Sequence, residues 1–257
     1  MLGIAALELF SLPLESKLRS ISDDAYHGYI GQIPHLAYES LNINDVDSPI
    51  AVHDFTHLMW PEGNSTFSNT VVAFAKPLQE LVEIVQKMIL QTLGVEKHYD
   101  SLASSITYAL RISEYGVPLN QETKIALDPH RDPNLLTVVC QHKIGGLEVQ
   151  TTDGDWIIVQ PSPNSVTVMV GLGFQAWSNM RVRAPRHRVK VLANERRFSA
   201  FYGSRPSHNS IVKGPKELGD DEYHPLLYKP FNYTDFVSFI YSESQRNGER
   251  SRIRSLL

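Results

Sequence analysis

The feature that most constrains the fold is a change of sequence period near residue 105. Beyond it, short segments rich in β-branched and aromatic residues are separated by Gly, Pro, Asn and Asp. Such segments predict strands, and their close spacing is typical of an all-β sandwich or barrel. Asp153-Gly154, between two alternating runs, predicts a hairpin. The predicted strands are ITYALRISEY, IALDPHRD, LLTVVCQH, GGLEVQTTD, DWIIVQP, SVTVMVG, QAWSN, APRHRVKVL and RRFSAFYGSRP.

The segments on either side of this β region have helical patterns. LELFSLPLESKLRS predicts a helix, a turn and a second short helix, whereas AYHGYIGQIPHLAYESLN predicts an ordered loop. A long helix should follow, capped by Ser65 or Thr66 and kinked or divided at Pro77. Another helix is predicted after Pro230. The apolar stripe expected along the long helix is Val71, Phe74, Leu78, Leu81, Val85 and Met88.

Length and composition are compatible with one substantial core, because the chain has 257 residues of which 42% are hydrophobic. We expect a helical region over 1–104 that packs on the core, a β core over 105–230, and a C-terminal helix and tail over 231–257. The net charge of −4 gives no basic footprint for nucleic acids or anionic membranes. The single cysteine, Cys140, cannot form a disulfide within the chain, which favours a reducing compartment. The expected location is therefore the cytoplasm. We also expect a monomer whose partner is a small molecule.

A candidate metal site begins at His130 and Asp132. In an extended segment, residues two apart point to the same side, so this imidazole and carboxylate should converge. His187, in another predicted strand, could supply a third ligand if the two strands are neighbours. Two histidines and one carboxylate with open positions suit non-heme Fe(II) oxygenases. The His-x-Asp pair alone is weak evidence, because surface loops produce it by chance.

A candidate anion site lies ten residues beyond His187. Arg197 and Ser199 share one face of a predicted strand, and burying an unpaired guanidinium there would be costly. Arginine can pair with a carboxylate through two parallel hydrogen bonds. The two residues therefore predict a carboxylate-binding site near the candidate metal.

The motifs PHRDPNLLTVV, IGGLEVQTTDGDWIIVQPSPNS, FQAWSN, APRHRV and RRFSAFYG together resemble plant 2-oxoglutarate- and Fe(II)-dependent dioxygenases. YHGYIGQIPH and EYHPLLYKPFNYTDF are most similar to the specialised-metabolism branch that includes the AOP-type enzymes. The resemblance covers nearly the whole chain. Family members begin with several dozen further residues, so we also expect a strand and a helix to be lacking at the N-terminal side.

The resemblance implies a double-stranded β-helix, or jelly roll, flanked by helices. It also implies Fe(II) bound by His130, Asp132 and His187, and 2-oxoglutarate bound by Arg197, Ser199 and Tyr115. With O₂ as the other co-substrate, and ascorbate as an optional reductant, the products would be succinate, CO₂ and a hydroxylated, desaturated or dealkylated metabolite. The implied substrate pocket includes Trp60, Phe174, Phe236 and Phe239, although core packing explains these aromatic residues equally well.

Three alternatives stay open at this point. Relatives usually carry a small hydroxyl residue where this chain has Arg131, so the chain could be a jelly roll that binds a ligand without turnover. A metal-free sugar- or hormone-binding jelly roll would leave Arg197 and Ser199 unexplained. His53 and His57 have the spacing of a zinc helix without its glutamate, which favours a loop or short helix near the substrate entrance.

Overall fold

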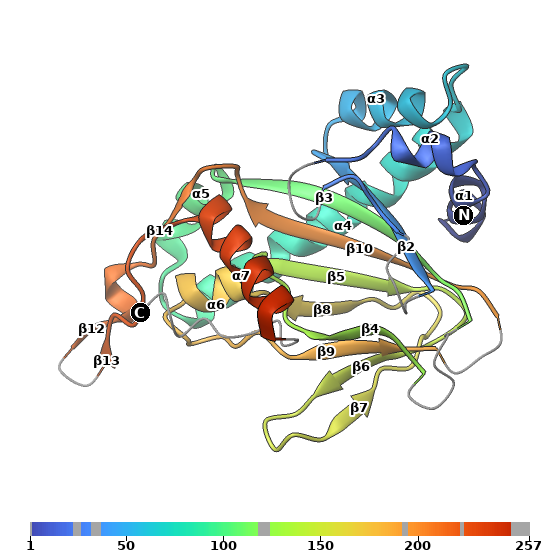
Figure 1. Ribbon diagram of the computed structural model, residues 1–257. Helices are drawn as coiled ribbons and strands as arrows, with labels where there is room; N and C mark the ends of the chain where they lie inside the picture. Colours follow the sequence, from blue (N-terminus) through green and yellow to red (C-terminus); the bar gives the residue numbers. More distant parts are fainter. Residues whose placement is uncertain are drawn as a thin grey trace.

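The computed structural model describes residues 2–22, 27–31, 37–117, 124–191, 195–221 and 224–247. Its centre is a pair of antiparallel sheets (Figure 1). The larger sheet has the strand order β1-β2-β3-β10-β5-β8, and the smaller has the order β4-β9-β6-β7. The prediction of a sandwich or barrel of short strands is confirmed. The predicted C-terminal tail lies outside the described residues from position 248 onward.

Most strands of the two sheets are paired with partners that are distant along the chain. In the larger sheet they are β1 (Tyr29–Ile30), β2 (Tyr38–Asn44), β3 (Ile106–Tyr115), β5 (Leu136–Gln141), β8 (Thr167–Val170) and β10 (Arg197–Pro206). In the smaller sheet they are β4 (Ile125–His130), β6 (Leu147–Gln150), β7 (Trp156–Ile158) and β9 (His187–Lys190). The hairpin expected at Asp153-Gly154 joins β6 to β7, where Gly154 has a φ of 98°. Two small ladders pair β11 (Ile211–Val212) with β14 (Phe231–Asn232) and β12 (Asp220–Asp221) with β13 (His224–Pro225).

The two faces of the larger sheet differ in chemistry. Side chains alternate between faces along a strand, so neighbouring residues of β10 enter different environments. On the outer face, Ala200 and Tyr202 join Leu110 and Ile112 of β3 in the main hydrophobic core. The inner face, toward the smaller sheet, carries polar residues of both strands: Arg111, Ser113, Tyr115, Arg197, Ser199 and Arg205. The outer face therefore builds the core, and the inner face is available for a polar site.

Helices flank the larger sheet. In Figure 1, α4 (Ser65–Thr92) runs behind it, and α7 (Tyr233–Asn247) lies in front. Residues of α1 (Leu2–Phe10), α3 (Pro49–Met59) and α4 share one core with the outer face of the sheet. The remaining helical segments are α2 (Leu14–Leu18), α5 (Tyr99–Ala103), α6 (Leu172–Trp177) and the short 3-10 turns Glu96–His98 and Lys216–Leu218.

The long helix α4 departs from the predicted details at its N-cap and along its buried stripe. Asn64, rather than Ser65 or Thr66, is its N-cap, and the Asn64 side chain accepts a hydrogen bond from Phe67 N at 2.9 Å. The helix also continues through Pro77 without being divided. The buried stripe is rotated from the expected one, so that Gln86 is buried and Met88 is 59% exposed. An alternation of three and four residues fits several adjacent stripes of a 3.6-residue helix, and tertiary packing selects among them.

Two further predictions of local structure were wrong. The segment expected as a loop contains β1 and β2, because polar Ser40 and Asn42 alternate with apolar Leu41 and Ile43. Its Gly- and Pro-rich beginning concealed that alternation. The expected strand 175–179 lies mostly in the short helix α6, which begins after Gly171. Apolar runs this short do not distinguish a strand from a helix.

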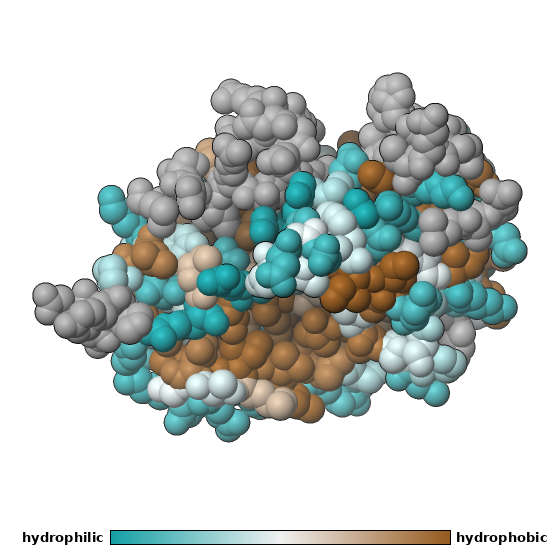
Figure 2. All heavy atoms as spheres, turned by 90° about the horizontal axis from the view of Figure 1, so that it is seen from below, coloured by the Kyte–Doolittle hydropathy of each residue, from teal (hydrophilic) through white to brown (hydrophobic). Residues whose placement is uncertain are grey.

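Apolar side chains gather in a broad patch on the face seen from below (Figure 2). The lowest element in Figure 1 is the hairpin of β6 and β7, where Ile157 is 56% exposed and Ile158 is 48% exposed. Within the described part of the chain, every helix is too short or too polar to serve as a membrane span.

Candidate metal and co-substrate site

Strand pairing in the smaller sheet brings the predicted metal ligands together. His130 is the last residue of β4 and His187 is the first of β9, and the two are direct partners in the antiparallel register. Their ring centroids lie 4.2 Å apart. Asp132 follows in the loop after β4, so its approach to the histidines depends on the path of that loop rather than on strand alternation. All three residues are buried.

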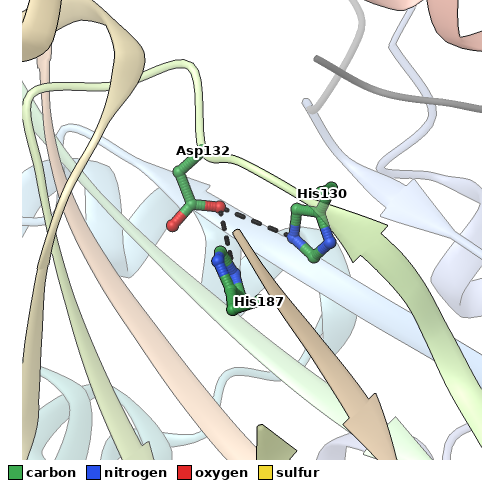
Figure 3. A group of neighbouring side chains, drawn as sticks. All are labelled: His130, Asp132 and His187. Atoms are coloured by element: carbon green, nitrogen blue, oxygen red, sulfur yellow. Dashed lines mark ion pairs between the residues drawn. The ribbon is translucent and has the colours of Figure 1, made fainter. Parts of the chain in front are cut away.

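The three side chains point at a common centre (Figure 3). Asp132 Oδ1 lies 3.6 Å from His130 Nε2 and 3.6 Å from His187 Nε2. One ligand atom from each residue lies within 4.8 Å of the others, and among the described residues this is the group of such side chains able to hold a metal. First-row metals bind N and O ligands at about 2.0–2.2 Å, so two ligands of one ion are about 3–3.6 Å apart. Both Oδ1–Nε2 separations lie at the upper end of that range.

The donor chemistry of the group also suits a cation. His130 Nδ1 lies 2.7 Å from the carbonyl oxygen of Asp128. Because a carbonyl can only accept, Nδ1 must carry the proton, and Nε2 of the neutral ring presents a lone pair to the centre. A carboxylate oxygen and an imidazole lone pair pointing at one buried spot require a positive charge there. Two histidines and one carboxylate are the ligand set of non-heme Fe(II) oxygenases.

Asp132 is held in place from the opposite sheet. Its second oxygen, Oδ2, accepts a 2.6 Å hydrogen bond from Thr137 Oγ1 on β5, and its backbone oxygen accepts one from Leu172 N. Thr137 is fully buried, so this bond is shielded from water. One carboxylate oxygen is thereby fixed, and the other is left facing the histidines.

Arg131 points away from this group. Its Nε donates to the carbonyl oxygen of Ala184 at 3.0 Å. Burial lowers the pKa of Arg131, and the neighbouring Arg186 lowers it further. The guanidinium thus binds the segment that leads into β9 and does not face the ligand group.

The second part of the site lies on the inner face of the larger sheet. Arg197, at the start of β10, is 1% exposed. Its guanidinium donates to Gly145 O at 3.1 Å and to Gln141 Oε1 at 3.0 Å. Among the residues that the structure describes, none supplies a carboxylate to Arg197 within ion-pair distance. Burial lowers the pKa of Arg197, as expected for a cation that has lost water without gaining an anion.

Ser199 and Tyr115 complete this part of the site. Arg197 Nη1 lies 3.4 Å from Ser199 Oγ, and its Cζ lies 4.6 Å from the centre of the Tyr115 ring, its register partner on β3. Burial raises the pKa of Tyr115, against the opposing effect of Arg197. Gly146 permits the close packing, because a Cβ there would meet Lys190 O at 2.1 Å and its φ is 144°. A neutral hydroxyl pair and a cation therefore face one buried position, a donor set suited to a carboxylate.

The four aromatic residues expected around a substrate lie on separate elements, and two of them are in the main core. Trp60 follows α3 and packs on Phe67, with ring centroids 4.8 Å apart. Phe174 and Phe236 are fully buried in the main core, and Phe239 is half-buried on α7. None of the four lines the cavity of about 520 Å³ beside the inner face of β10. His53 and His57 lie on the short helix α3.

Sequence reasoning missed the residues that support the two sets of ligands. Thr137 holds Asp132, and Gln141 binds Arg197. Both are polar residues of the otherwise apolar strand β5, and their polarity is the available signal of a supporting role. The role of Gln141 depends on pairing between β5 and β10, and that of Thr137 on the path of the loop between β4 and β5, neither of which the local sequence specifies.

Sequence comparison places the chain among known oxygenases. Residues 106–206 match the model of the 2OG-Fe(II) oxygenase superfamily. A relative from Arabidopsis thaliana, "Probable 2-oxoglutarate-dependent dioxygenase AOP1", is 41% identical over 93% of this chain and 80% of its own length. Another, "Probable inactive 2-oxoglutarate-dependent dioxygenase AOP2", is 30% identical over 93% of this chain and 81% of its own length.

Solved structures agree with this placement. The rice dioxygenase for auxin oxidation has a TM-score of 0.79 and 28% identity, covering 99% of this chain and 83% of its own. The Arabidopsis dioxygenase for auxin oxidation 1, in complex with 2-oxoglutarate, has a TM-score of 0.78 and 25% identity, covering 86% and 83%. The expected jelly-roll core with flanking helices is confirmed, and Fe(II) and 2-oxoglutarate are the cofactor and co-substrate of this family. The chain belongs to the 2OG-Fe(II) oxygenase superfamily.

Proposed function

We propose that this protein oxidises a small plant specialised metabolite, with His130, Asp132 and His187 as the ligands of Fe(II). Arg197, Ser199 and Tyr115 bind the distal carboxylate of 2-oxoglutarate. The observation that carries the proposal is the pairing of two incomplete sites on facing sheets. One ligand atom from each of three buried residues converges on one point, and the buried guanidinium of Arg197 has no described carboxylate partner.

Each part of the site has a separate task. When bound, Fe(II) supplies the activation of O₂ that couples decarboxylation of 2-oxoglutarate to succinate and CO₂ with oxidation of the metabolite. Thr137 keeps Oδ1 of Asp132 aimed at the histidines, and Asp128 fixes the tautomer of His130. Arg197 neutralises and orients the co-substrate, and burial of the site excludes water. The outcome for the metabolite is hydroxylation, desaturation or dealkylation.

A second candidate function is ligand binding without turnover. The observation in its favour is Arg131, a cation that lies between His130 and Asp132 in the sequence. A relative 30% identical to this chain is named a probable inactive dioxygenase. The bond from Arg131 to Ala184 holds this cation off the ligand group, which favours the active enzyme.

The test is release of succinate from 2-oxoglutarate, in the presence of Fe(II) and O₂, by purified protein. Wild-type protein should release succinate, and Asp132→Ala should lose about 10³-fold or more of that rate, because a two-histidine site holds iron weakly. Asp153→Asn, at the exposed turn of the β6–β7 hairpin, is the matched carboxylate control and should leave the rate unchanged. Activity that survives Asp132→Ala would mean that the ligand set is wrong.

A further inference from the structure

The loop that carries Asp132 is held between two elements of the fold. The backbone oxygen of Asp132 accepts a hydrogen bond from Leu172 N of α6 at 2.7 Å, and Leu135 N donates to Ser204 O of β10 at 2.9 Å. Asn134, between these two anchors, is 5% exposed. Its side-chain amide therefore has to find its hydrogen-bond partners inside the protein.

The Asn134 amide has one orientation. Its Nδ2 atom lies 3.0 Å from Leu136 O and 3.0 Å from Thr137 Oγ1. Because a carbonyl oxygen can only accept, the atom that faces Leu136 must be the NH₂ nitrogen. Both protons of this group are thereby used, one on the backbone and the other on the Thr137 hydroxyl.

The Thr137 hydroxyl has a single proton and two acceptors within reach. Asp132 Oδ2 lies 2.6 Å from Thr137 Oγ1, whereas Asn134 Oδ1 lies 3.2 Å from it. The proton goes to Asp132, because the carboxylate is closer and a charged acceptor forms the stronger bond. The hydrogen bonds then run in one direction, from the amide to the hydroxyl and from the hydroxyl to the carboxylate. Bonds aligned in this way strengthen one another.

Two glycines leave the space that the Asn134 amide occupies. A Cβ on Gly171, directly before α6, would meet Asn134 Oδ1 at 2.3 Å. A Cβ on Gly203 of β10 would meet Asn134 Nδ2 at 2.9 Å. Both distances are shorter than van der Waals contact. The amide is thus enclosed on two sides, which fixes its orientation toward Thr137.

We propose that Asn134 is a positioning residue of the metal site: its amide orients the Thr137 hydroxyl, and that hydroxyl aims Asp132 at the two histidines. Asn134 is not itself a ligand and acts through Thr137. The inference rests on the proposed function, because Asp132 is the ligand that Asn134 serves.

The test is a double-mutant cycle on metal affinity, measured by titration with Mn(II) so that no turnover is needed. Asn134→Ala should weaken Mn(II) binding about fivefold in the wild-type background, less than the loss of a residue that bonds directly to a metal ligand. In the Thr137→Val background, which has no hydroxyl to orient, the same change should weaken binding less than about 1.5-fold. A residue that only supports the fold would weaken binding by the same factor in both backgrounds.

Two further variants separate positioning from lost packing. Asn179 is another buried asparagine, and its Nδ2 donates to Leu218 O at 2.9 Å. Asn179→Ala is the matched control, and it should lower the unfolding temperature of the metal-free protein without changing Mn(II) affinity. Asn134→Ser supplies one donor proton instead of two, so it should keep an intermediate affinity. If Asn134→Ala does not fold, Asn134→Ser takes its place in the cycle.

Bound Co(II) provides a second readout, because its absorption spectrum reports the geometry of the ligands. The spectrum should change in Asn134→Ala and stay unchanged in Asn179→Ala. A loss of Mn(II) affinity confined to the background that retains Thr137 would support the role of Asn134. Equal loss in both backgrounds, wild-type affinity in Asn134→Ala, or an unchanged Co(II) spectrum in that variant would overturn it.

Asp132→Ala tests the proposed function separately. Mn(II) binding that survives this change would show that the ligand set itself is wrong. Loss of binding in Asp132→Ala together with unchanged binding in Asn134→Ala would contradict the role of Asn134 alone.

Discussion

The two faces of β10 show how one strand serves two different purposes. Its outward residues, such as Ala200 and Tyr202, are in the apolar core against the helices. Its inward residues Arg197 and Ser199 are also buried, but they are polar. The chemistry of the two faces therefore differs even where both are buried. The outer face therefore stabilises the fold, whereas the inner face presents buried hydrogen-bond donors that a ligand can bind.

The largest expected effect comes from removing the cation of the inner face. Arg197→Met should weaken 2-oxoglutarate binding about 100-fold or more, because the carboxylate loses its charged partner. The same change should leave the ligand-free protein as stable as the wild type or more so, since an unpaired buried charge is unfavourable. Thermal unfolding with and without 2-oxoglutarate measures both effects. A large loss of stability without ligand would show that Arg197 is structural.

A substitution that creates a cavity on the outer face should lower stability but leave ligand affinity nearly unchanged. Leu110→Ala, at a fully buried residue of β3, should lower the free energy of unfolding by roughly 2–5 kcal/mol. Its effect on 2-oxoglutarate affinity, measured below the unfolding transition, should be less than about threefold. Chemical denaturation and calorimetric titration check the two values. A matched loss of ligand affinity would mean that the two faces are coupled.

A smaller effect is expected at the contact between the two sheets. Thr137→Val removes the hydrogen bond to Asp132 Oδ2, so the carboxylate loses its fixed orientation. Metal affinity should fall about tenfold, as is usual for residues that orient metal ligands. Titration with Mn(II), followed by 2-oxoglutarate binding, measures this loss. Thr137→Ser keeps the hydroxyl and is the control, which should retain most of the affinity.

The smallest effect is expected at Arg131, which sits in the ligand loop but points away from the ligands. Arg131→Ser should change metal affinity and succinate release by less than about threefold, because the lost bond is to the Ala184 backbone. A rise of tenfold or more in succinate release would instead support the candidate function without turnover, and would mean that Arg131 suppresses activity in this chain.

The sequence predicts the β core and the identity of the central ligands, because both depend on local patterns. His130 and Asp132 are close along the chain, and His187 lies in a strand of recognisable composition. The segment that forms β2 was not recognised as a strand, because its Gly- and Pro-rich beginning concealed the alternation of polar and apolar residues that follows. Pairing of β2 with β3 places Asn42 beside Arg111.

The supporting residues could not be predicted, since their roles depend on a loop conformation and on strand register that local patterns do not specify. Thr137 lies close to Asp132 in the sequence, but their hydrogen bond depends on the path of the loop between β4 and β5. Arg111 reaches its position through pairing with β2 and β10. The sequence also does not show whether the aromatic residues expected around a substrate face a pocket or the core. Phe174 and Phe236 lie in the core, as their apolar surroundings in the sequence equally allow.

The pairing of His130 with His187 has a consequence for biosynthesis. Translation proceeds from the N-terminus, so a nascent chain carries His130 and Asp132 well before its second imidazole has been made. Arg197 emerges later still. Until His187 is made, the chain therefore offers only two of the three proposed ligands, and the proposed metal site can form only after β9 has emerged and docked beside β4.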